Sequence, residues 1–192
     1  YGSQPDFSNL VGWSTSATID YEFSHYLDVK SITAYRKNLG KFAQDRDGSP
    51  IGVNYVYDHY QERQFSGEVQ ANGRALNNRL HYSAGVYYFD QSGFDINPTQ
   101  FYIMSLLSGG YFTDRSYAAY AQATYSITKK FNITAGVRYT EDNKSFLPNQ
   151  YYKSTIGAPI FYQVPETRLV PYERYHNNNA RWTPMVNLSL RQ

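Results

Sequence analysis

Few residues of this 192-residue chain combine the types and spacing that catalysis needs. His81 and Ser83 are two residues apart, so on a β-strand they share a face, as the base and nucleophile of a hydrolase would. Asp58 and His59 are adjacent and suggest an acid–histidine pair, but neighbouring polar residues are common in any solvated loop. Polar side chains on one face of a strand are equally common wherever that face meets water. We therefore expect no catalytic residues.

Metal and cofactor motifs are equally weak. The segment from Asp45 to Gly48 resembles part of a calcium loop, but Ala43 stands where an earlier Asp is needed and no terminal Glu follows. It therefore reads as a turn. The absence of cysteine excludes disulfides, thiolate metal sites and cysteine nucleophiles. No glycine-rich phosphate loop is present, and the histidines lack paired ligand spacing: His25, His59, His81 and His176. We expect neither a metal nor a cofactor.

The composition narrows the class of protein. Aromatic residues make up 18% of the chain, with 21 tyrosines among them, and charged residues also make up only 18%, against about 25% in ordinary soluble domains. The net charge of +2 is too small to indicate nucleic-acid binding. The chain is polar overall, and no run approaches the roughly 20 apolar residues of a spanning helix. Aromatic residues favour strands and membrane interfaces, so a β-barrel remains the one way across a bilayer.

Seven segments alternate between apolar and polar residues with the period of a β-strand. The pattern is less clean in the second segment, where Leu27, Val29, Thr33 and Tyr35 share a face and the register stays uncertain. Pro184 weakens the last segment because proline cannot donate to a ladder. The predicted strands are residues 13–23, 27–37, 64–71, 80–88, 117–127, 131–140 and 182–191.

The connections between these strands alternate in length. Short turns are predicted near 23–26, near 72–79 with an Asn72-Gly73 turn signal, and near 128–130. Long links cover about residues 38–62, 90–115 and 141–180. This layout, with aromatic residues near the strand ends, is typical of a transmembrane antiparallel β-barrel with short periplasmic turns and long extracellular loops. Lipocalin-like barrels and carbohydrate-binding sandwiches share the alternation and remain open at this point.

Several strand segments resemble the barrel domain of TonB-dependent outer-membrane receptors. The most specific is Ala118-Ala119-Tyr120-Ala121-Gln122-Ala123-Thr124-Tyr125, followed by Phe131-Asn132-Ile133-Thr134-Ala135-Gly136-Val137-Arg138-Tyr139-Thr140. Residues 31–36, 83–89 and 182–190 add shorter similarities. Together the resemblance covers roughly residues 13–37, 64–90, 116–145 and 181–191.

The resemblance implies a location in the outer membrane of a Gram-negative bacterium and TonB-dependent active uptake of a scarce solute. Family members have a 22-stranded barrel closed by an N-terminal plug, which carries a segment that contacts TonB. With seven strands, no plug, no such segment and no closing strand with a terminal aromatic residue, we expect residues 1–192 to be a partial, central piece of the barrel domain. The implied partners are outer-membrane lipid, the TonB complex through the missing plug segment, and a small solute such as a ferric siderophore, the family default. Vitamin B12, haem, sugars and plant polymers are the other solutes of the family.

The long loops are rich in aromatic residues, which suit contact with an aryl-rich chelate or a sugar. The same rings could instead brace strands that extend beyond the membrane, so both roles stay open. Residues 103–107 are predicted to form an apolar turn in the lumen. Residues 38–62 and 90–115 each hold two more acidic than basic residues, which argues against a strongly anionic ligand. The candidate ligand contacts are Tyr55, Tyr57, Tyr60, Phe101, Tyr102, Tyr111, Phe112, Tyr151, Tyr152, Phe161 and Tyr162, with Tyr172 and Tyr175 in the same loops.

Two functions of other classes stay as alternatives. One is a small self-contained outer-membrane barrel that acts as an adhesin or a surface hydrolase, which would need an eighth strand. The other is a soluble sugar-binding β domain, which would fold in water without detergent.

Overall fold

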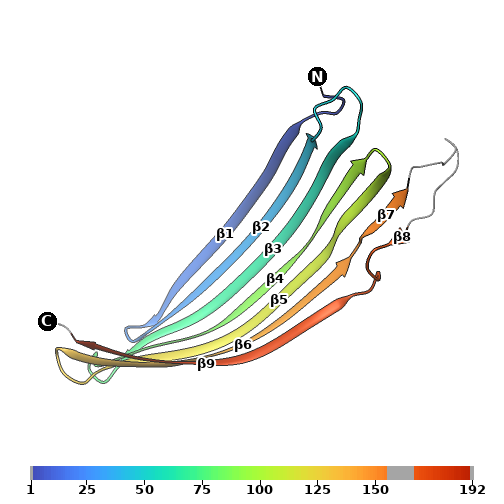
Figure 1. The fold of residues 1–192 in the computed structure, drawn as a ribbon. Coiled ribbons are helices and arrows are strands. Elements are labelled where there is room, and N and C mark those ends of the chain that lie inside the picture. Colours follow the sequence, from blue (N-terminus) through green and yellow to red (C-terminus); the bar gives the residue numbers. More distant parts are fainter. Residues whose placement is uncertain (1, 155–166, 191–192) are drawn as a thin grey trace.

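Seven long strands and two short ones form one antiparallel sheet in this computed structural model, which describes residues 2–154 and 167–190. Each long strand pairs with the next long strand in the chain, and the sheet bends strongly along its length (Figure 1). Within the described residues the sheet is open, with β1 and β9 at its edges. These residues include no helix long and apolar enough to cross a membrane. The strands are β1 (Phe7–Ser24), β2 (Leu27–Asp45), β3 (Asn54–Ala75), β4 (Leu80–Phe101), β5 (Met104–Ser126), β6 (Phe131–Pro148), β7 (Tyr151–Ser154), β8 (Thr167–Arg168) and β9 (Tyr175–Leu190).

The all-β antiparallel prediction is confirmed, and each predicted strand lies within a long strand of the sheet with two small exceptions. The fifth runs one residue past the end of β5, to Ile127, and the last takes in residue 191, outside the described part. The register of β2, uncertain from the sequence, is regular: residues 27–45 pair one by one with β3. Leu27, Val29, Thr33 and Tyr35 therefore share a face, as predicted. Pro184 lies opposite Val137, and the ladder between β6 and β9 continues on both sides of it.

The prediction of long irregular loops is wrong for much of their length. Residues 38–45 continue β2, 54–62 begin β3, and β4 and β5 are joined through residues 102 and 103 alone. The 23 residues of β5 are about twice the 9–11 that cross a bilayer. Beyond the lipid neither face of a strand has to be apolar, so the alternation fades although the backbone ladder continues.

Two further predictions about turns are only partly right. The connection predicted near residues 72–79 does contain the turn from β3 to β4, but the Asn72-Gly73 signal does not make it. Asn72 and Gly73 lie inside β3, and the turn to β4 is made by Leu76, Asn77 and Asn78, whose φ angles are 53°, 54° and 64°. Gly73 is needed for another reason: a Cβ there would lie 2.2 Å from Cζ of Tyr82, whose ring covers it. The predicted apolar turn at 103–107 is mostly strand, because residues 104–107 belong to β5 and pair with β4 and β7.

Alternate residues point to opposite faces, and the two faces differ in chemistry. One face, here named the outer face, carries large apolar side chains that are exposed, such as Ile19, Val86 and Val186 at 66%, 58% and 72%. The opposite, inner face carries polar side chains such as Glu68 and Gln122. Because a one-layer sheet cannot bury its apolar face in itself, this face requires an apolar solvent.

A row of aromatic side chains, here named the aromatic row, crosses the outer face and takes one residue from each long strand. Several neighbouring rings touch, with centroids 5.2 Å apart for Trp13 and Tyr35 and 4.9 Å apart for Tyr139 and Trp182. Two residues above the row in five strands stand charged side chains: Lys37, Arg63, Asp90, Arg115 and Glu141. The row consists of Trp13, Tyr35, Phe65, Tyr88, Tyr117, Tyr139 and Trp182.

The slope of the aromatic row matches the tilt of strands in a membrane barrel. The row shifts by two residues in register from β1 to β2, from β3 to β4 and from β5 to β6, and it does not shift between the other neighbouring strands. The average shift is therefore one residue per strand. With a rise of ~3.3 Å per residue and ~4.8 Å between strands, the row is inclined by about 35° to the hydrogen-bond direction. Strands of outer-membrane barrels tilt by about 35–45° from the bilayer normal. The row therefore runs parallel to the membrane plane and marks one surface of the bilayer.

Candidate functional site

The inner face is polar at the level of the aromatic row. The Tyr120 hydroxyl donates to Oε1 of Glu68 at 2.8 Å, and the Arg138 guanidinium lies 6.0 Å from the centroid of the Tyr87 ring. Gly85 makes room for Tyr120, because a Cβ there would lie 2.7 Å from its hydroxyl oxygen. An arginine and a carboxylate at this depth require a lumen rather than lipid.

Above the aromatic row, the inner face of β3 and β4 holds three carboxylates around a tyrosine. Tyr60 lies opposite Asp95, and its hydroxyl donates to Oε2 of Glu62. Burial, together with the bond to Glu62, raises the pKa of Tyr60 to about 12. Burial and the neighbouring Asp95 raise the pKa of Asp58, whose buried Oδ1 has no hydrogen-bond partner among the described residues. This surface favours neutral or cationic groups over anions.

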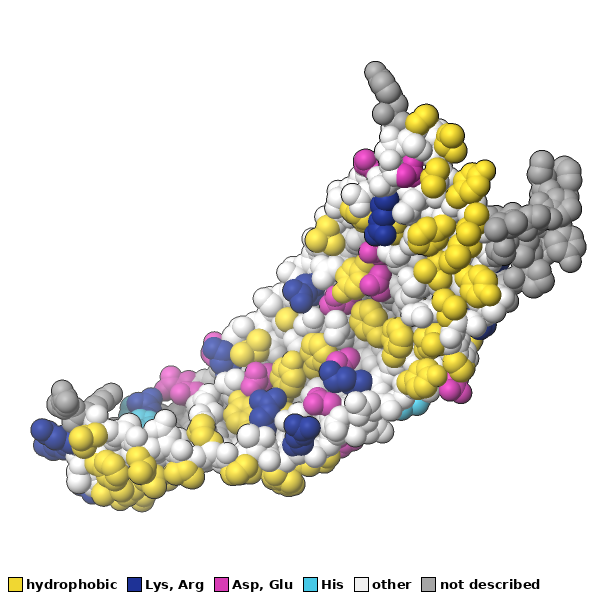
Figure 2. All heavy atoms as spheres, viewed as in Figure 1, with side chains coloured by type: hydrophobic (Ala, Val, Ile, Leu, Met, Phe, Trp, Pro, Cys, Tyr) yellow, Lys and Arg dark blue, Asp and Glu magenta, His cyan; other side chains and the backbone are white. Residues whose placement is uncertain are grey.

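Aromatic rings and an ion pair continue the inner face across β4, β5 and β6. The Phe112 ring covers Gly93, where a Cβ would lie 2.8 Å from its Cζ. Next to it Nζ of Lys144 lies 2.9 Å from Oδ2 of Asp114. Phe112, Asp114 and Lys144 line a groove of about 310 Å³ together with Phe146. Figure 2 shows charged side chains over the middle of one face and hydrophobic ones gathered toward the upper strand ends.

The aromatic residues predicted to contact a ligand divide between the two faces. Strand register places Tyr60, Phe101, Phe112 and Tyr152 on the inner face. It places four others on the outer face: Tyr55, Tyr57, Tyr111 and Tyr151. Tyr102 lies at the tip of the β4–β5 hairpin and is 71% exposed. Phe161 and Tyr162 lie outside the described residues. The structure thus brings four of the candidates to one surface.

Two aromatic residues of the third loop have structural contacts. The Arg168 guanidinium lies 5.1 Å from the ring centroid of Tyr151 and 4.9 Å from that of Tyr172. Tyr175 begins β9 opposite Phe146. Tyr151 and Tyr172 therefore brace the pairing of β7 with β8.

Sequence reasoning missed the polar members of the inner surface. In the sequence Glu62 and Asp95 are visible only as part of the acidic excess of two predicted loops, and no pattern singles out Phe146. The alternation of faces along β3 would have found the polar ones. Every second residue from Glu68 toward the start of β3 lies on the inner face, and this series includes Glu62, Tyr60 and Asp58. Following this series requires knowing that β3 continues beyond the membrane.

The other sequence motifs have ordinary structural positions. Asp58 and His59 point to opposite faces, and the His59 ring packs on Phe94 at 4.9 Å between centroids. His81 and Ser83 share the inner face, with His81 opposite Arg74. No group of three or more His, Asp or Glu side chains among the described residues is arranged to hold a metal ion.

The segment around Asp45 forms a tight turn, in agreement with the prediction. Asp47 accepts hydrogen bonds from the backbone of Ser49 at 2.9 Å and of Val53 at 3.1 Å. A hydrogen bond from the Ser49 side chain, together with bonds from backbone N–H groups, lowers the pKa of Asp47 against the opposing effect of burial.

These features define a wall segment of a transmembrane β-barrel. The outer face is lipid-facing and the inner face is polar, the aromatic row has the slope that strands tilted in a membrane require, and the strands continue far above the row. The chain belongs to the TonB-dependent receptor-like β-barrel family, whose model matches residues 1–191. Members of this family are proteins of the Gram-negative outer membrane, and this barrel segment is accordingly placed there.

Individual relatives agree with this family. The chain is 38% identical over 69 residues to the pesticin receptors of Yersinia enterocolitica serotype O:8 / biotype 1B and of Yersinia pestis, a match that covers 36% of this chain and 9% of each relative. A solved structure, the ferric yersiniabactin uptake receptor of Yersinia pestis, matches 95% of this chain and 25% of its own, with a TM-score of 0.64 and 16% identity. The second match shows a shared fold. The matched segment thus spans about a tenth of the length of the pesticin receptors.

Proposed function

We propose that residues 1–192 are part of the barrel wall of a TonB-dependent importer and that its solute is a ferric siderophore. In this proposal extracellular segments and a plug capture the solute, and the TonB complex moves the plug to let it pass. Family membership supports the receptor class. The fold shared with a ferric yersiniabactin uptake receptor supports the choice of an iron chelate.

The observation that carries the solute site is the inner surface above the aromatic row. There the rings of Tyr60 and Phe112 stand on neighbouring parts of one face with Asp58, Asp95 and the 310 Å³ groove. Rings of this kind give flat apolar contact at low entropic cost, and the polar groups between them orient a ligand. No covalent chemistry is required of any residue.

The charge of the inner surface narrows the type of chelate. Asp58, Glu62 and Asp95 face the lumen together, and Lys144 is already paired with Asp114. A chelate with several negative charges would be repelled, whereas a neutral or weakly charged one would not. We therefore propose a ferric siderophore without a large net negative charge.

The test compares adjacent residues on opposite faces of β5 in the whole receptor. Phe112→Ala removes a ring from the inner surface, whereas Tyr111→Ala removes one from the outer face. Radioactive iron uptake is measured in cells that lack other receptors for the supplied siderophore. Losing an anchoring ring costs roughly 2 kcal/mol, which predicts an apparent affinity about 30-fold weaker for Phe112→Ala. Tyr111→Ala should match the unchanged receptor.

Equal uptake by both variants, at equal surface abundance, would refute the assignment of the inner surface. The charge argument has a separate test, the Asp58→Asn and Asp95→Asn double variant. It should bind an anionic ferric chelate at least several-fold better than the unchanged receptor and a neutral one equally well. If the unchanged receptor already prefers the anionic chelate, the charge argument is wrong although import can stand.

A further inference from the structure

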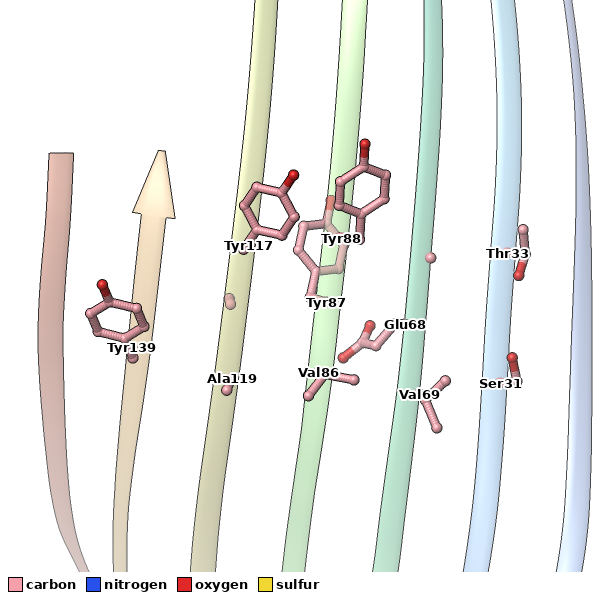
Figure 3. Close-up of a pocket in the computed structure, with 12 residues that line it drawn as sticks. Ser31, Thr33, Glu68, Val69, Val86, Tyr87, Tyr88, Tyr117, Ala119 and Tyr139 are labelled. Carbon is pink, nitrogen blue, oxygen red and sulfur yellow. The ribbon is translucent and has the colours of Figure 1, made fainter. Parts of the chain in front are cut away.

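A hollow interrupts the outer face just below the aromatic row. It has a volume of about 620 Å³, with Thr33, Gly67 and Val86 among the residues of its wall. Figure 3 shows Tyr117 and Tyr88 side by side on neighbouring strands at its upper part, with Tyr139 lower on the next strand. Small side chains on β2 and β3 make the floor, since the nearest atom to a Cβ built on Gly67 is a Phe65 ring carbon at 3.8 Å. Because this face meets lipid, the hollow is suited to a hydrocarbon chain.

Two cations stand directly opposite each other above the hollow. Lys37 on β2 pairs in register with Arg63 on β3, both are exposed, and each lies two residues above a ring of the aromatic row. Like charges in directly opposed positions destabilise a sheet. The carboxylate of the next strand, Asp90, accepts from Nε of Arg115 at 2.7 Å. An anion between Lys37 and Arg63 would remove their repulsion at the level of lipid headgroups.

A pair of rings lies above these cations on the same face. His59 is four residues above Arg63 on β3, and its ring meets that of Phe94 on β4 edge to face, with centroids 4.9 Å apart. Such rings present flat apolar surface with a polar edge. They lie outside the hydrocarbon, where the polar part of a lipid would extend.

We propose that the outer face of β2 to β4 binds a phosphorylated glycolipid of the outer leaflet. An acyl chain occupies the hollow, a phosphate lies between Lys37 and Arg63, and a sugar ring covers His59 and Phe94. With a rise of ~3.3 Å per residue, the phosphate level is about 20 Å above Val69 in the hollow and about 13 Å below His59. A phospholipid would satisfy the two cations and the hollow but would leave the ring pair uncovered. This proposal depends on the outer-membrane location and not on the solute.

The experiment purifies the whole receptor in mild detergent and counts bound lipid by native mass spectrometry. The probe is a defined bisphosphorylated diglucosamine lipid carrying acyl chains, added to delipidated receptor. The Lys37→Gln and Arg63→Gln double variant should bind it at least about tenfold more weakly, because two charge-assisted contacts are lost. The matched control is Lys129→Gln with Lys130→Gln, which removes two charges from the exposed turn between β5 and β6 at the other end of the strands.

Two more variants test the other layers. Gly67→Leu fills the hollow and should lower binding with Lys37 and Arg63 in place, while heat-dependent gel mobility reports that the barrel is intact. Phe94→Ala should weaken binding of the glycolipid but leave binding of phosphatidylglycerol unchanged.

Equal binding by the double variant and its control would overturn the proposal. So would phosphatidylglycerol that competes as well as the glycolipid, since the site would then recognise any anionic lipid. Iron uptake is not used as the readout, so failure of this proposal and failure of the import proposal remain distinguishable.

Discussion

Gly109 is the position in β5 where a single methyl group should do most damage. Its φ is +113°, and a Cβ there would lie 1.9 Å from the carbonyl oxygen of Asp95 and 3.1 Å from Cα of Ile96. Its own carbonyl accepts from the backbone N–H of Asn149 at 2.9 Å. Because the atoms that a methyl group would meet are backbone, no side chain can move aside to admit it. Gly109→Ala must therefore shift the β4–β5 ladder.

The size of the effect follows from two contributions. An alanine at positive φ costs about 1–2 kcal/mol, and each ladder hydrogen bond lost with the shift costs about 1 kcal/mol. Together they give about 3 kcal/mol, or about a hundredfold increase in local opening of the upper hairpin. Hydrogen exchange of the amides of residues 96–108 in the whole receptor measures this opening directly.

Gly67→Ala is the matched control, because Gly67 sits in the same sheet at ordinary φ and the nearest atom to its added Cβ is 3.8 Å away. It should leave exchange unchanged or slow it slightly. Exchange in Gly109→Ala that equals exchange in Gly67→Ala would refute the backbone-strain argument.

Three other perturbations separate burial, lipid contact and surface charge. The folded-state pKa of Asp58 is raised, so the stability that Asp58 contributes is present below its unfolded-state pKa and is lost as the pH rises through its folded-state pKa. Asp58→Asn should therefore raise the thermal midpoint at neutral pH, and this gain should vanish near pH 3. A gain that does not depend on pH would contradict the argument. Val137→Arg puts a charge on the lipid-facing surface, midway between Tyr117 and Tyr125 in register, and should lower the free energy of unfolding in folding titrations by about 2–4 kcal/mol. Ser83→Arg on the inner face should lower it by under about 1 kcal/mol, and equal costs would refute the assignment of faces. Arg115→Gln breaks an exposed ion pair and should change stability by less than about 1 kcal/mol, which the same titrations check.

The membrane-spanning halves of the strands were predictable because lipid imposes a rule on every second residue. Residues 117–126 and 131–140 show this best: their apolar sets lie on the outer face, and their register agrees with the alternation. Above the aromatic row both faces meet water, so residues 38–45 and 54–62 lost the pattern while keeping the backbone ladder. Only pairing with neighbouring strands shows that they are strand.

The sequence predicted which residue types form the candidate site, but not which face of the sheet each side chain points to. Tyr111 and Phe112 looked equivalent as loop aromatics, yet one strand residue separates a lipid-side position from a lumen-side one. The turn at Asn72-Gly73 failed for a related reason, since the glycine serves the Tyr82 ring across the strand pair. A glycine or an aromatic residue in the sequence can serve several structural roles, and only the strand register shows which role it has.

The meander has a consequence for how such a wall can be assembled. Every long strand pairs with its predecessor in the chain, and most of the connections between them are short. Closing a short loop costs little entropy, so each new hairpin can zip onto the last strand without waiting for a distant partner. The growing edge then always exposes a fresh ladder of N–H and C=O groups, which makes the newest strand the template for the next one. A defect high in one hairpin, such as the one predicted at Gly109, would therefore leave the earlier strands properly zipped and stall addition from that point onward.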